Sequence, residues 1–72
     1  MAEVRPGRYL HFKGNEYTVV DVAIHTETGE EFVVYRQEYG ERLLFVRPKD
    51  MFQETVTRDG KTMPRFKYVG EK

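Results

Sequence analysis

The sequence predicts one small all-β domain over residues 1–72, either a barrel or a sandwich. Its apolar residues fall in short runs rich in Val, Phe, Tyr, Ile and Thr, and these runs are bounded by Gly, Asn, Asp or Pro, as strands and turns are. Helical periodicity is sustained nowhere, and turn signals recur at intervals of about 8 to 12 residues. The chain is too short for two domains, and the pattern gives about five or six short strands.

The first two strands are expected over residues 8–12 and 17–25, with a turn at residues 13–15. The second strand is long and has apolar residues on both faces. Strict alternation gives it one face with Val20, Val22 and Ile24, and another with Tyr17, Val19, Asp21 and Ala23. A strand of this kind is expected to bend across two layers.

The third and fourth strands are expected over residues 31–37 and 42–47 and form a hairpin. The pattern leaves the register of this hairpin open. A four-residue loop places Tyr35 beside Leu44, whereas a three-residue loop places it beside Phe45, and a slip of one residue exchanges the two faces.

Pro48 lacks a backbone donor and is expected to end the ladder, so that residues 49–52 form a single helical turn. Such a turn can close one end of a barrel with Met51 and Phe52.

The last part of the chain contains a strong hairpin signal. Val56 and Thr57 lead into Asp59-Gly60, and this dipeptide favours a two-residue turn because both of its positions tolerate positive φ. Residues 66–68 are then expected to form a short last strand.

Composition excludes several classes of protein. The chain has no Cys and no Ser, so it carries neither a disulfide framework nor a thiolate metal site, and its candidate nucleophiles are reduced to Thr, Lys, Tyr and the carboxylates. Its start has no apolar run of signal-peptide length, and no segment approaches the roughly 20 apolar residues of a membrane span. The glycines are dispersed and precede no expected helix, so they cradle no phosphate. We therefore expect a cytoplasmic protein that is not an enzyme, uses no cofactor and does not bind membranes.

Charge is balanced overall but unevenly distributed. Lys plus Arg and Asp plus Glu number 12 each. Residues 14–46 carry seven acidic and two basic side chains, whereas residues 1–13 have net charge +2 and residues 47–72 have +3. Six basic side chains would share a surface if the chain ends lie side by side: Arg5, Arg8, Lys13, Lys61, Arg65 and Lys67. Binding of RNA or single-stranded DNA through these ends is one alternative function, although zero net charge argues against strong nonspecific affinity.

Several motifs occur in an order that is similar to that of a known family. They are Pro6 to Tyr9, His11 to Gly14, Tyr17, His25 to Glu30, Val34-Tyr35, Tyr39-Gly40, Val46 to Pro48, Met51-Phe52, Asp59-Gly60 and Pro64 to Phe66. Together they resemble the short bacterial domain-of-unknown-function family 1653 over roughly residues 6–67. The resemblance implies a small stand-alone protein with an SH3-like barrel, and it brings no reaction, ligand or cofactor. Phe45 stands where the family typically carries Trp, which removes any role that needs an indole N–H.

Two histidines lie on different expected strands. His11 and His25 would form a two-His, one-carboxylate metal site with Asp21 or Glu27 if the first two strands pair. This spacing matches no ligand motif, so a small metal-dependent enzyme or accessory protein is only the second alternative. The favoured interpretation is that His11 caps an aromatic cluster with Tyr9 and Tyr17 and that His25 forms a hydrogen bond to the loop it opens.

Five Phe and five Tyr are many for so small an interior. Phe12, Phe32, Phe52 and Phe66 are expected to fill the core. Every tyrosine hydroxyl needs water or a partner, so the tyrosines either bridge neighbouring strands or remain at the surface.

We favour the second interpretation and expect a non-catalytic binding module. Its binding surface would join Tyr35, Tyr39, Phe45 and Arg47, with His25 at the margin, and would dock an unidentified peptide or protein. Arg47 would then hold an anionic group as a planar fork, unless it pairs with an acidic neighbour. Exposed strand edges also permit self-association.

Overall fold

The computed structural model describes residues 4–71, which form seven strands and one short helix. The elements are β1 (Gly7–His11), β2 (Glu16–Ile24), β3 (Glu31–Gln37), β4 (Leu44–Pro48), α1 (Lys49–Phe52), β5 (Thr55–Arg58), β6 (Lys61–Pro64) and β7 (Phe66–Gly70). The all-β class is therefore confirmed. Most expected strands occur within one or two residues of their predicted bounds.

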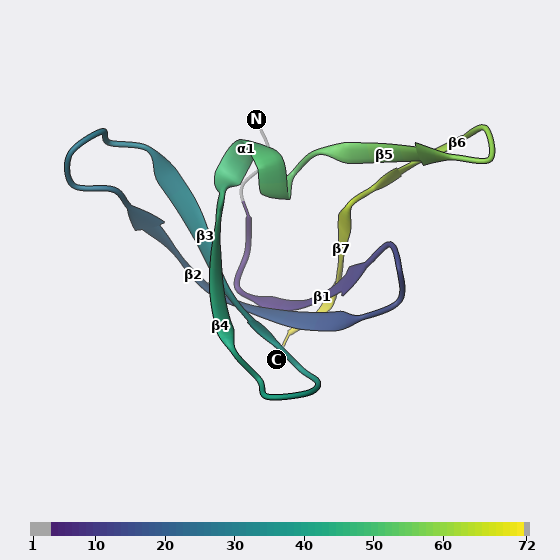
Figure 1. Cartoon of the computed structure of the whole chain (residues 1–72), viewed down its shortest axis with the longest axis horizontal. Helices are drawn as coiled ribbons and strands as arrows, with labels where there is room; N and C mark the ends of the chain where they lie inside the picture. The colour runs from purple at the N-terminus through teal and green to yellow at the C-terminus, as the bar shows by residue number, and fades with distance from the viewer. Residues whose placement is uncertain (1–3, 72) are drawn as a thin grey trace.

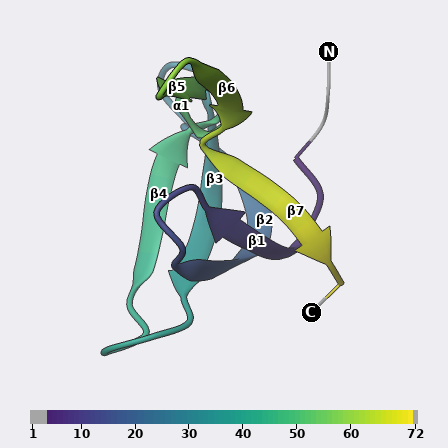
Figure 2. The same ribbon diagram turned by 90° about the vertical axis from the view of Figure 1, so that its right-hand side faces the viewer.

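Five strands form one antiparallel sheet in the order β4-β3-β2-β1-β7, and β5 and β6 form a separate two-stranded ribbon (Figure 1). The two ends of the described chain meet because β1 lies between β2 and β7. The sheet does not close on itself: within residues 4–71 its ladder ends at β4 on one side and at β7 on the other (Figure 2). The closed barrel expected from the sequence is thus not formed, and the SH3-like arrangement stays a prediction.

The β5–β6 ribbon is built on the expected turn. Asp59 and Gly60 have φ values of 52° and 75°, so both occupy the left-handed region that a two-residue hairpin turn requires. The turn folds residues 61–64 back onto β5, with Thr57 opposite Thr62. Strand β6 was not predicted, because the composition of residues 61–64 is a weak strand signal.

A β-bulge changes the faces of β2. The register between β2 and β3 shifts between Val19 and Asp21, so Val20 is the extra residue. Val19 then lies opposite Tyr35 and Val22 opposite Val33, which puts both valines on the inner face of the sheet. The predicted alternation is therefore wrong beyond Val19. The bulge also provides the bend that was expected in this long strand.

The register of the β3–β4 hairpin is now fixed. Tyr35 lies opposite Phe45, and Val33 lies opposite Arg47, so these four side chains share the inner face. The loop over residues 38–42 is longer than either loop considered from the sequence.

The single turn of α1 follows Pro48 as predicted, with Gln53 N donating to Lys49 O at 3.1 Å. Phe52 is buried and its side chain is 2% exposed, but Met51 is 49% exposed. Only Phe52 closes the core, and the expectation that Met51 does so was wrong. Successive residues of a helical turn point about 100° apart, so the two side chains cannot face the same interior.

The core holds fewer phenylalanines and more tyrosines than expected. Its buried apolar residues are Val4, Tyr9, Val19, Val33, Tyr35, Phe52 and Phe66. Phe12 and Phe32, which were expected inside, are only half-buried. Two tyrosines therefore occupy interior space assigned to phenylalanine, and each brings a hydroxyl that needs a partner.

Candidate functional site

Tyr35 is the centre of an aromatic network on the inner face of the sheet. Its ring centroid lies 5.4 to 5.8 Å from those of Tyr17, Phe45, Phe52 and Phe66. These contacts are edge-to-face or tilted, the arrangements that aromatic quadrupoles favour. The ring of Tyr35 is buried, so this residue supports the surface from below and is not itself exposed.

The hydroxyl of Tyr35 is bonded to Arg47. Arg47 Nε donates to Tyr35 Oη at 3.2 Å, and the guanidinium carbon lies 5.9 Å from the centroid of the Phe66 ring. Within residues 4–71, Arg47 belongs to no ion pair. Because Nε is already engaged, the fork is held in one orientation with its terminal N–H groups available to an anion.

Tyr17 and Tyr39 form a second linked pair. Their hydroxyl oxygens are 2.6 Å apart, and their rings meet edge to face with centroids 5.6 Å apart. Tyr39 is 40% exposed, whereas Tyr17 is half-buried. Burial, followed by the hydrogen bond with Tyr39, raises the pKa of Tyr17 to about 12. Tyr17 therefore stays a neutral phenol at physiological pH.

His11 packs into the same network. Its ring lies 4.9 Å from Phe66 and 6.2 Å from Tyr17, measured between centroids. The expectation that His11 caps an aromatic cluster is confirmed for Tyr17. Its Nδ1 accepts a hydrogen bond from the backbone N–H of Lys13 at 3.2 Å.

Positive charge surrounds His11. Burial has the largest effect on it and lowers its pKa, and the charges of Arg65, Lys13 and Arg47 lower it further. These three cations come from distant parts of the chain. The part of the inner face around His11 is therefore electropositive, in a protein with no net charge.

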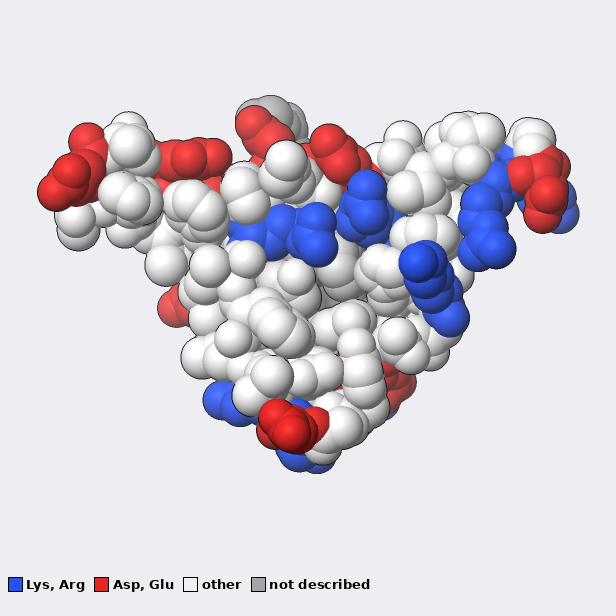
Figure 3. All heavy atoms as spheres, viewed as in Figure 1, with Lys and Arg blue, Asp and Glu red and all other residues white. Residues whose placement is uncertain are grey.

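We call the surface formed by His11, Tyr17, Tyr39, Phe45 and Arg47 the aromatic–arginine face. Tyr35 joins its parts, since the Tyr35 ring contacts both Tyr17 and Phe45. Figure 3 shows Lys and Arg side chains in a band across the upper part of one side of the molecule, above an area of mainly uncharged side chains.

Acidic neighbours partly neutralise the cations beside this face. Arg65 Nη2 lies 3.4 Å from Glu54 Oε1. Lys49 Nζ lies 3.3 Å from Glu31 Oε1. Arg65 Nε is buried and has no hydrogen-bond partner within the described chain. Within residues 4–71, Arg47 is thus a guanidinium of this face that belongs to no ion pair.

The structure brings together three of the five predicted site residues, links a fourth and separates the fifth. Tyr35, Phe45 and Arg47 are neighbours, and Tyr39 reaches them through Tyr17. His25 lies elsewhere. Its ring is 6.1 Å from that of Phe32, and it lines a shallow apolar hollow of about 300 Å³ with Ala23, Ile24 and Val46.

The separation of His25 follows from strand geometry. Phe32 and Tyr35 are an odd number of positions apart on β3, so their side chains point to opposite faces of the sheet. A residue beside Phe32 cannot reach the aromatic–arginine face. In its own loop, His25 Nδ1 accepts a hydrogen bond from Glu27 N at 3.2 Å, as expected.

The basic side chains of the chain ends do not form one patch. β1 and β7 pair, but Arg8 and Lys67 alternate with buried residues and lie on the outer face. Arg65 pairs with Glu54, and Lys61 belongs to the β5–β6 ribbon. The nucleic-acid surface expected from these ends is therefore divided between the faces of the sheet.

Two further observations concern chemistry and location. Residues 4–71 contain no group of three or more His, Asp or Glu side chains placed to hold a metal ion, so His11 and His25 share no such site with Asp21 or Glu27. The same residues include no helix of the length and apolarity needed to cross a bilayer.

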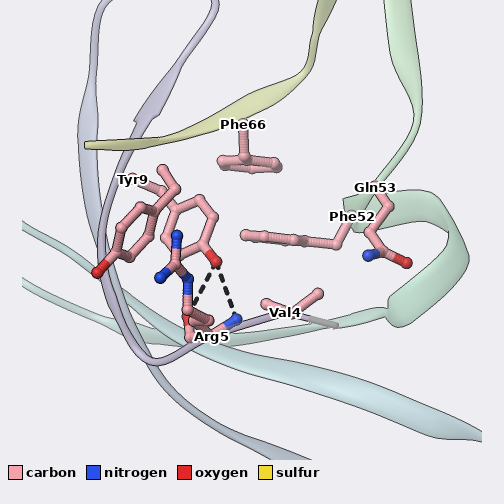
Figure 4. A pocket seen from close by; sticks show the side chains of 7 residues that line it. Val4, Arg5, Tyr9, Phe52, Gln53 and Phe66 are labelled. Atoms are coloured by element: carbon pink, nitrogen blue, oxygen red, sulfur yellow. Dashed lines mark hydrogen bonds between the residues drawn. The ribbon is translucent and has the colours of Figure 1, made fainter. Parts of the chain in front are cut away.

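A pocket of about 290 Å³ lies beside the core. It is lined by Val4, Arg5, Tyr9, Phe52, Gln53, Phe66 and Tyr68 (Figure 4). Tyr9 Oη accepts a bond from Arg5 N at 3.1 Å and donates to Arg5 O at 2.9 Å. The Arg5 guanidinium lies 4.0 Å over the Tyr68 ring. Arg5, Tyr9 and Tyr68 thus already contact one another. We interpret the pocket as the hollow between the N-terminal segment and the core.

The geometry can be compared with known proteins. The model of a protein family of unknown function, DUF1653, matches residues 7–68. The chain belongs to the DUF1653 family. It is also similar to the crystal structure of a DUF1653 protein from Bordetella bronchiseptica, with 37% identity, a TM-score of 0.87, and coverage of 96% of this chain and 91% of that one. No curated protein matches the chain. The resemblance noted from the sequence is thus confirmed.

Proposed function

We propose that this DUF1653 domain is a non-catalytic binding module. Its aromatic–arginine face would dock an extended peptide or protein segment that carries a carboxylate next to an apolar side chain. The observation that carries this proposal is the Arg47–Tyr35 hydrogen bond, which orients an unpaired guanidinium among exposed rings. The absence of cysteine suits a reducing compartment, and we place the protein in the cytoplasm.

The anionic half of the ligand follows from Arg47. A guanidinium offers planar, parallel N–H groups that match a carboxylate, and a hydrogen bond to a charged group contributes about 1.5–3 kcal/mol. The Tyr35 hydroxyl fixes the side chain before any ligand arrives, which reduces the entropy lost on binding. No carboxylate of residues 4–71 occupies this position.

The apolar half of the ligand follows from the exposed rings of the aromatic–arginine face. Phe45 and Tyr39 are 37% and 40% exposed, and both rest on tyrosines that are better buried. Such rings give a rigid platform, because an aromatic side chain loses little conformational freedom when it is covered. Aromatic-lined surfaces of this kind hold extended peptide segments in other small domains.

A nucleic acid suits this face less well than a peptide. Nonspecific affinity for nucleic acid grows with the number of phosphates neutralised, so it needs a row of free cations. Here Arg65 pairs with Glu54, and within residues 4–71 Arg47 and Lys13 are the cations near His11 that belong to no ion pair, which is too few for such a row. One oriented guanidinium recognises one anionic group.

Selection from a library of random peptides tests the proposal. We expect the immobilised domain to enrich peptides with Asp or Glu next to an aliphatic or aromatic residue. For each selected peptide, the matched version with Asn or Gln should bind at least about tenfold more weakly, because it loses a charge-assisted hydrogen bond. Amide chemical shifts of the labelled domain should change around Phe45, Arg47 and Tyr39.

Two variants provide the controls. Arg47→Gln should abolish the preference for acidic peptides. Arg36→Gln removes an arginine of β3 that lies off this face and donates to Arg42 O, and it should leave the preference unchanged. Enrichment that is indifferent to Arg47→Gln would overturn the proposal. So would a single-stranded RNA or DNA that binds the same face at moderate salt more tightly than any selected peptide.

A further inference from the structure

The open edge of β4 carries an unusual run of exposed apolar side chains. β4 ends the sheet order, and Figure 2 shows it at one side of the molecule with no strand beyond it. Leu43, Leu44 and Val46 are 49%, 51% and 62% exposed, and Phe45 is 37% exposed. Edge strands are normally protected by charge, proline or a covering segment. In β4 the only charged residue and the only proline are Arg47 and Pro48, at the last two positions of the strand.

The alternation of backbone hydrogen bonds in the β3–β4 hairpin shows which N–H and C=O groups of β4 point away from β3. Gln37 N donates to Leu43 O at 3.1 Å, so Leu43 and every second residue after it, Phe45 and Arg47, bond toward β3. Leu44 and Val46 therefore direct their N–H and C=O groups toward the open edge. Pro48 is two residues after Val46, so its nitrogen also points toward the open edge. The N–H that proline lacks therefore removes no hydrogen bond from the β3–β4 ladder.

We propose that two copies of this chain pair antiparallel through β4, about a two-fold axis at Val46. In this register, the N–H and C=O of Val46 bond to those of the second copy's Val46. The N–H of Leu44 meets the C=O of the second copy's Pro48. The open N–H groups of Leu44 and Val46 are then satisfied, and the C=O of Leu44 is left without a donor because it faces the second copy's Pro48.

Side-chain complementarity identifies a second copy as the occupant of this edge. On the inner face, Phe45 lies opposite the second copy's Arg47, at positions not hydrogen-bonded across the axis, where side chains approach most closely. A guanidinium beside an aromatic ring is attractive. On the outer face, Val46 meets Val46 and Leu44 meets Pro48. With zero net charge, the two copies do not repel each other at long range.

Neighbouring registers are less complementary. An axis at Phe45 places the two Phe45 rings against each other and leaves Arg47 opposite Leu43. An axis at Arg47 puts two guanidinium groups side by side, and like charges that face each other directly across strands are unfavourable. The proposed register alone pairs each Arg47 with a ring.

This dimer goes beyond the proposed function and does not depend on it. It joins the two sheets edge to edge and places two aromatic–arginine faces next to each other. A single strand edge buries less area than a standard interface, so we expect a weak dimer that dissociates on dilution.

Cysteine cross-linking tests the register, because the chain has no cysteine of its own. Directly opposite residues of a hydrogen-bonded antiparallel pair have Cα atoms about 5.5 Å apart, within the range of about 4.4–6.8 Å that a disulfide spans. Under mild oxidation, Val46→Cys should therefore form a disulfide-linked dimer. Val69→Cys is a matched control on β7, where Val69 is 40% exposed, and it should cross-link much less. Equal cross-linking at the two sites, or faster cross-linking of Phe45→Cys, would overturn the proposal.

Sedimentation measures the dimer without any cross-link. The native chain should shift from dimer to monomer on dilution, and Val46→Lys should weaken the dimer by at least about tenfold, because it brings two ammonium groups together at the axis. Val46 is largely exposed, so this variant should keep the native amide spectrum and should still bind acidic peptides if the proposed function is correct. A native chain that stays monomeric up to a concentration of about 1 mM would overturn the dimer proposal and leave the proposed function untouched. A dissociation constant of about 1 mM corresponds to a free energy of association of about −4.1 kcal/mol.

Discussion

Arg47 Nε donates a hydrogen bond to the hydroxyl of the buried Tyr35 at 3.2 Å, so a residue of the core holds a residue of the aromatic–arginine face. The Tyr35 ring fills interior space, and its hydroxyl reaches the boundary where Arg47 lies. The burial that holds the ring therefore also orients the guanidinium. Stability and recognition can be separated here by a change that removes a single oxygen atom.

Tyr35→Phe should keep the packing and release Arg47. We expect the free energy of unfolding to fall by about 0.5–1.5 kcal/mol, the net contribution of a typical hydrogen bond, as measured by urea denaturation. The Nε–H proton of Arg47 should exchange faster with water in nuclear magnetic resonance spectra. Tyr39→Phe, which leaves the Arg47 bond intact, is the control. Unchanged Nε–H exchange in Tyr35→Phe would show that the bond does not orient Arg47.

Phe52→Ala should be the most damaging change in the helical turn. The Phe52 ring stacks on Phe66 with centroids 4.2 Å apart and planes 7° apart, and its side chain is 2% exposed. Truncating a buried Phe costs about 3–5 kcal/mol, which is a large part of the stability of so small a domain. Met51→Ala in the same turn should change the free energy of unfolding by no more than about 0.5 kcal/mol, because Met51 is exposed. Similar losses for the two variants would contradict the assignment of Phe52 as the residue that closes the core.

Gly7 should not tolerate a side chain. Its φ is +142°, and an added Cβ would lie 2.7 Å from Gly70 O and 2.9 Å from Tyr68 Cε1, both in the neighbouring strand. Gly7→Ala should therefore destabilise the chain by more than about 1 kcal/mol. Gly14→Ala, at φ +102° with no atom within 4 Å of the added Cβ, isolates the backbone part of this cost. Thermal unfolding should show the greater loss at Gly7, and an equal loss at both sites would exclude the clash.

Much of the fold could be predicted because its turns have local causes. Asp59-Gly60 supplies two residues that accept positive φ, and Pro48, whose φ is fixed by its ring, stands where β4 ends and α1 begins. The bulge at Val20 has no such local signal, since valine is a good strand former on either side of it. The bulge arises because Val19 and Val22 can then both enter the core, a gain that depends on contacts with β3.

The site was partly predictable for a similar reason. Phe45 and Arg47 are two positions apart on one strand, so any register places them on the same face. Which tyrosines enter the core depends on partners that are distant in sequence, such as Arg47 for Tyr35. His11 and Tyr17 were missed as members of the surface, although the short turn between their strands could have indicated that they are close.

Tyr17 should resist ionisation. Its pKa is about 12 because of burial and the hydrogen bond with Tyr39, so the folded state keeps its proton at a pH where the unfolded state, with a pKa near 10.0, has lost it. The free energy of unfolding should therefore fall as the pH rises above 10. Tyr39→Phe should lower the pKa of Tyr17, measured by the absorbance of tyrosinate during an alkaline titration. A pKa that stays the same in Tyr39→Phe would leave burial as the only cause.

His11 should titrate below the ordinary histidine value of 6.5, because burial and the nearby cations disfavour its protonated form. The unfolded state then binds a proton at a higher pH than the folded state does. The free energy of unfolding should accordingly fall as the pH decreases through 6.5 and level off below the pKa of the folded state. Lys13→Gln removes one of the cations and should raise the pKa of His11, as followed by the shifts of its ring protons. Lys67→Gln removes a cation from the outer face and should leave the His11 titration unchanged.

A carboxylate bound to Arg47 should also raise the pKa of His11, since its negative charge offsets part of the positive charge near the imidazole. A selected acidic peptide that binds without moving the His11 titration would place its anionic group away from Arg47.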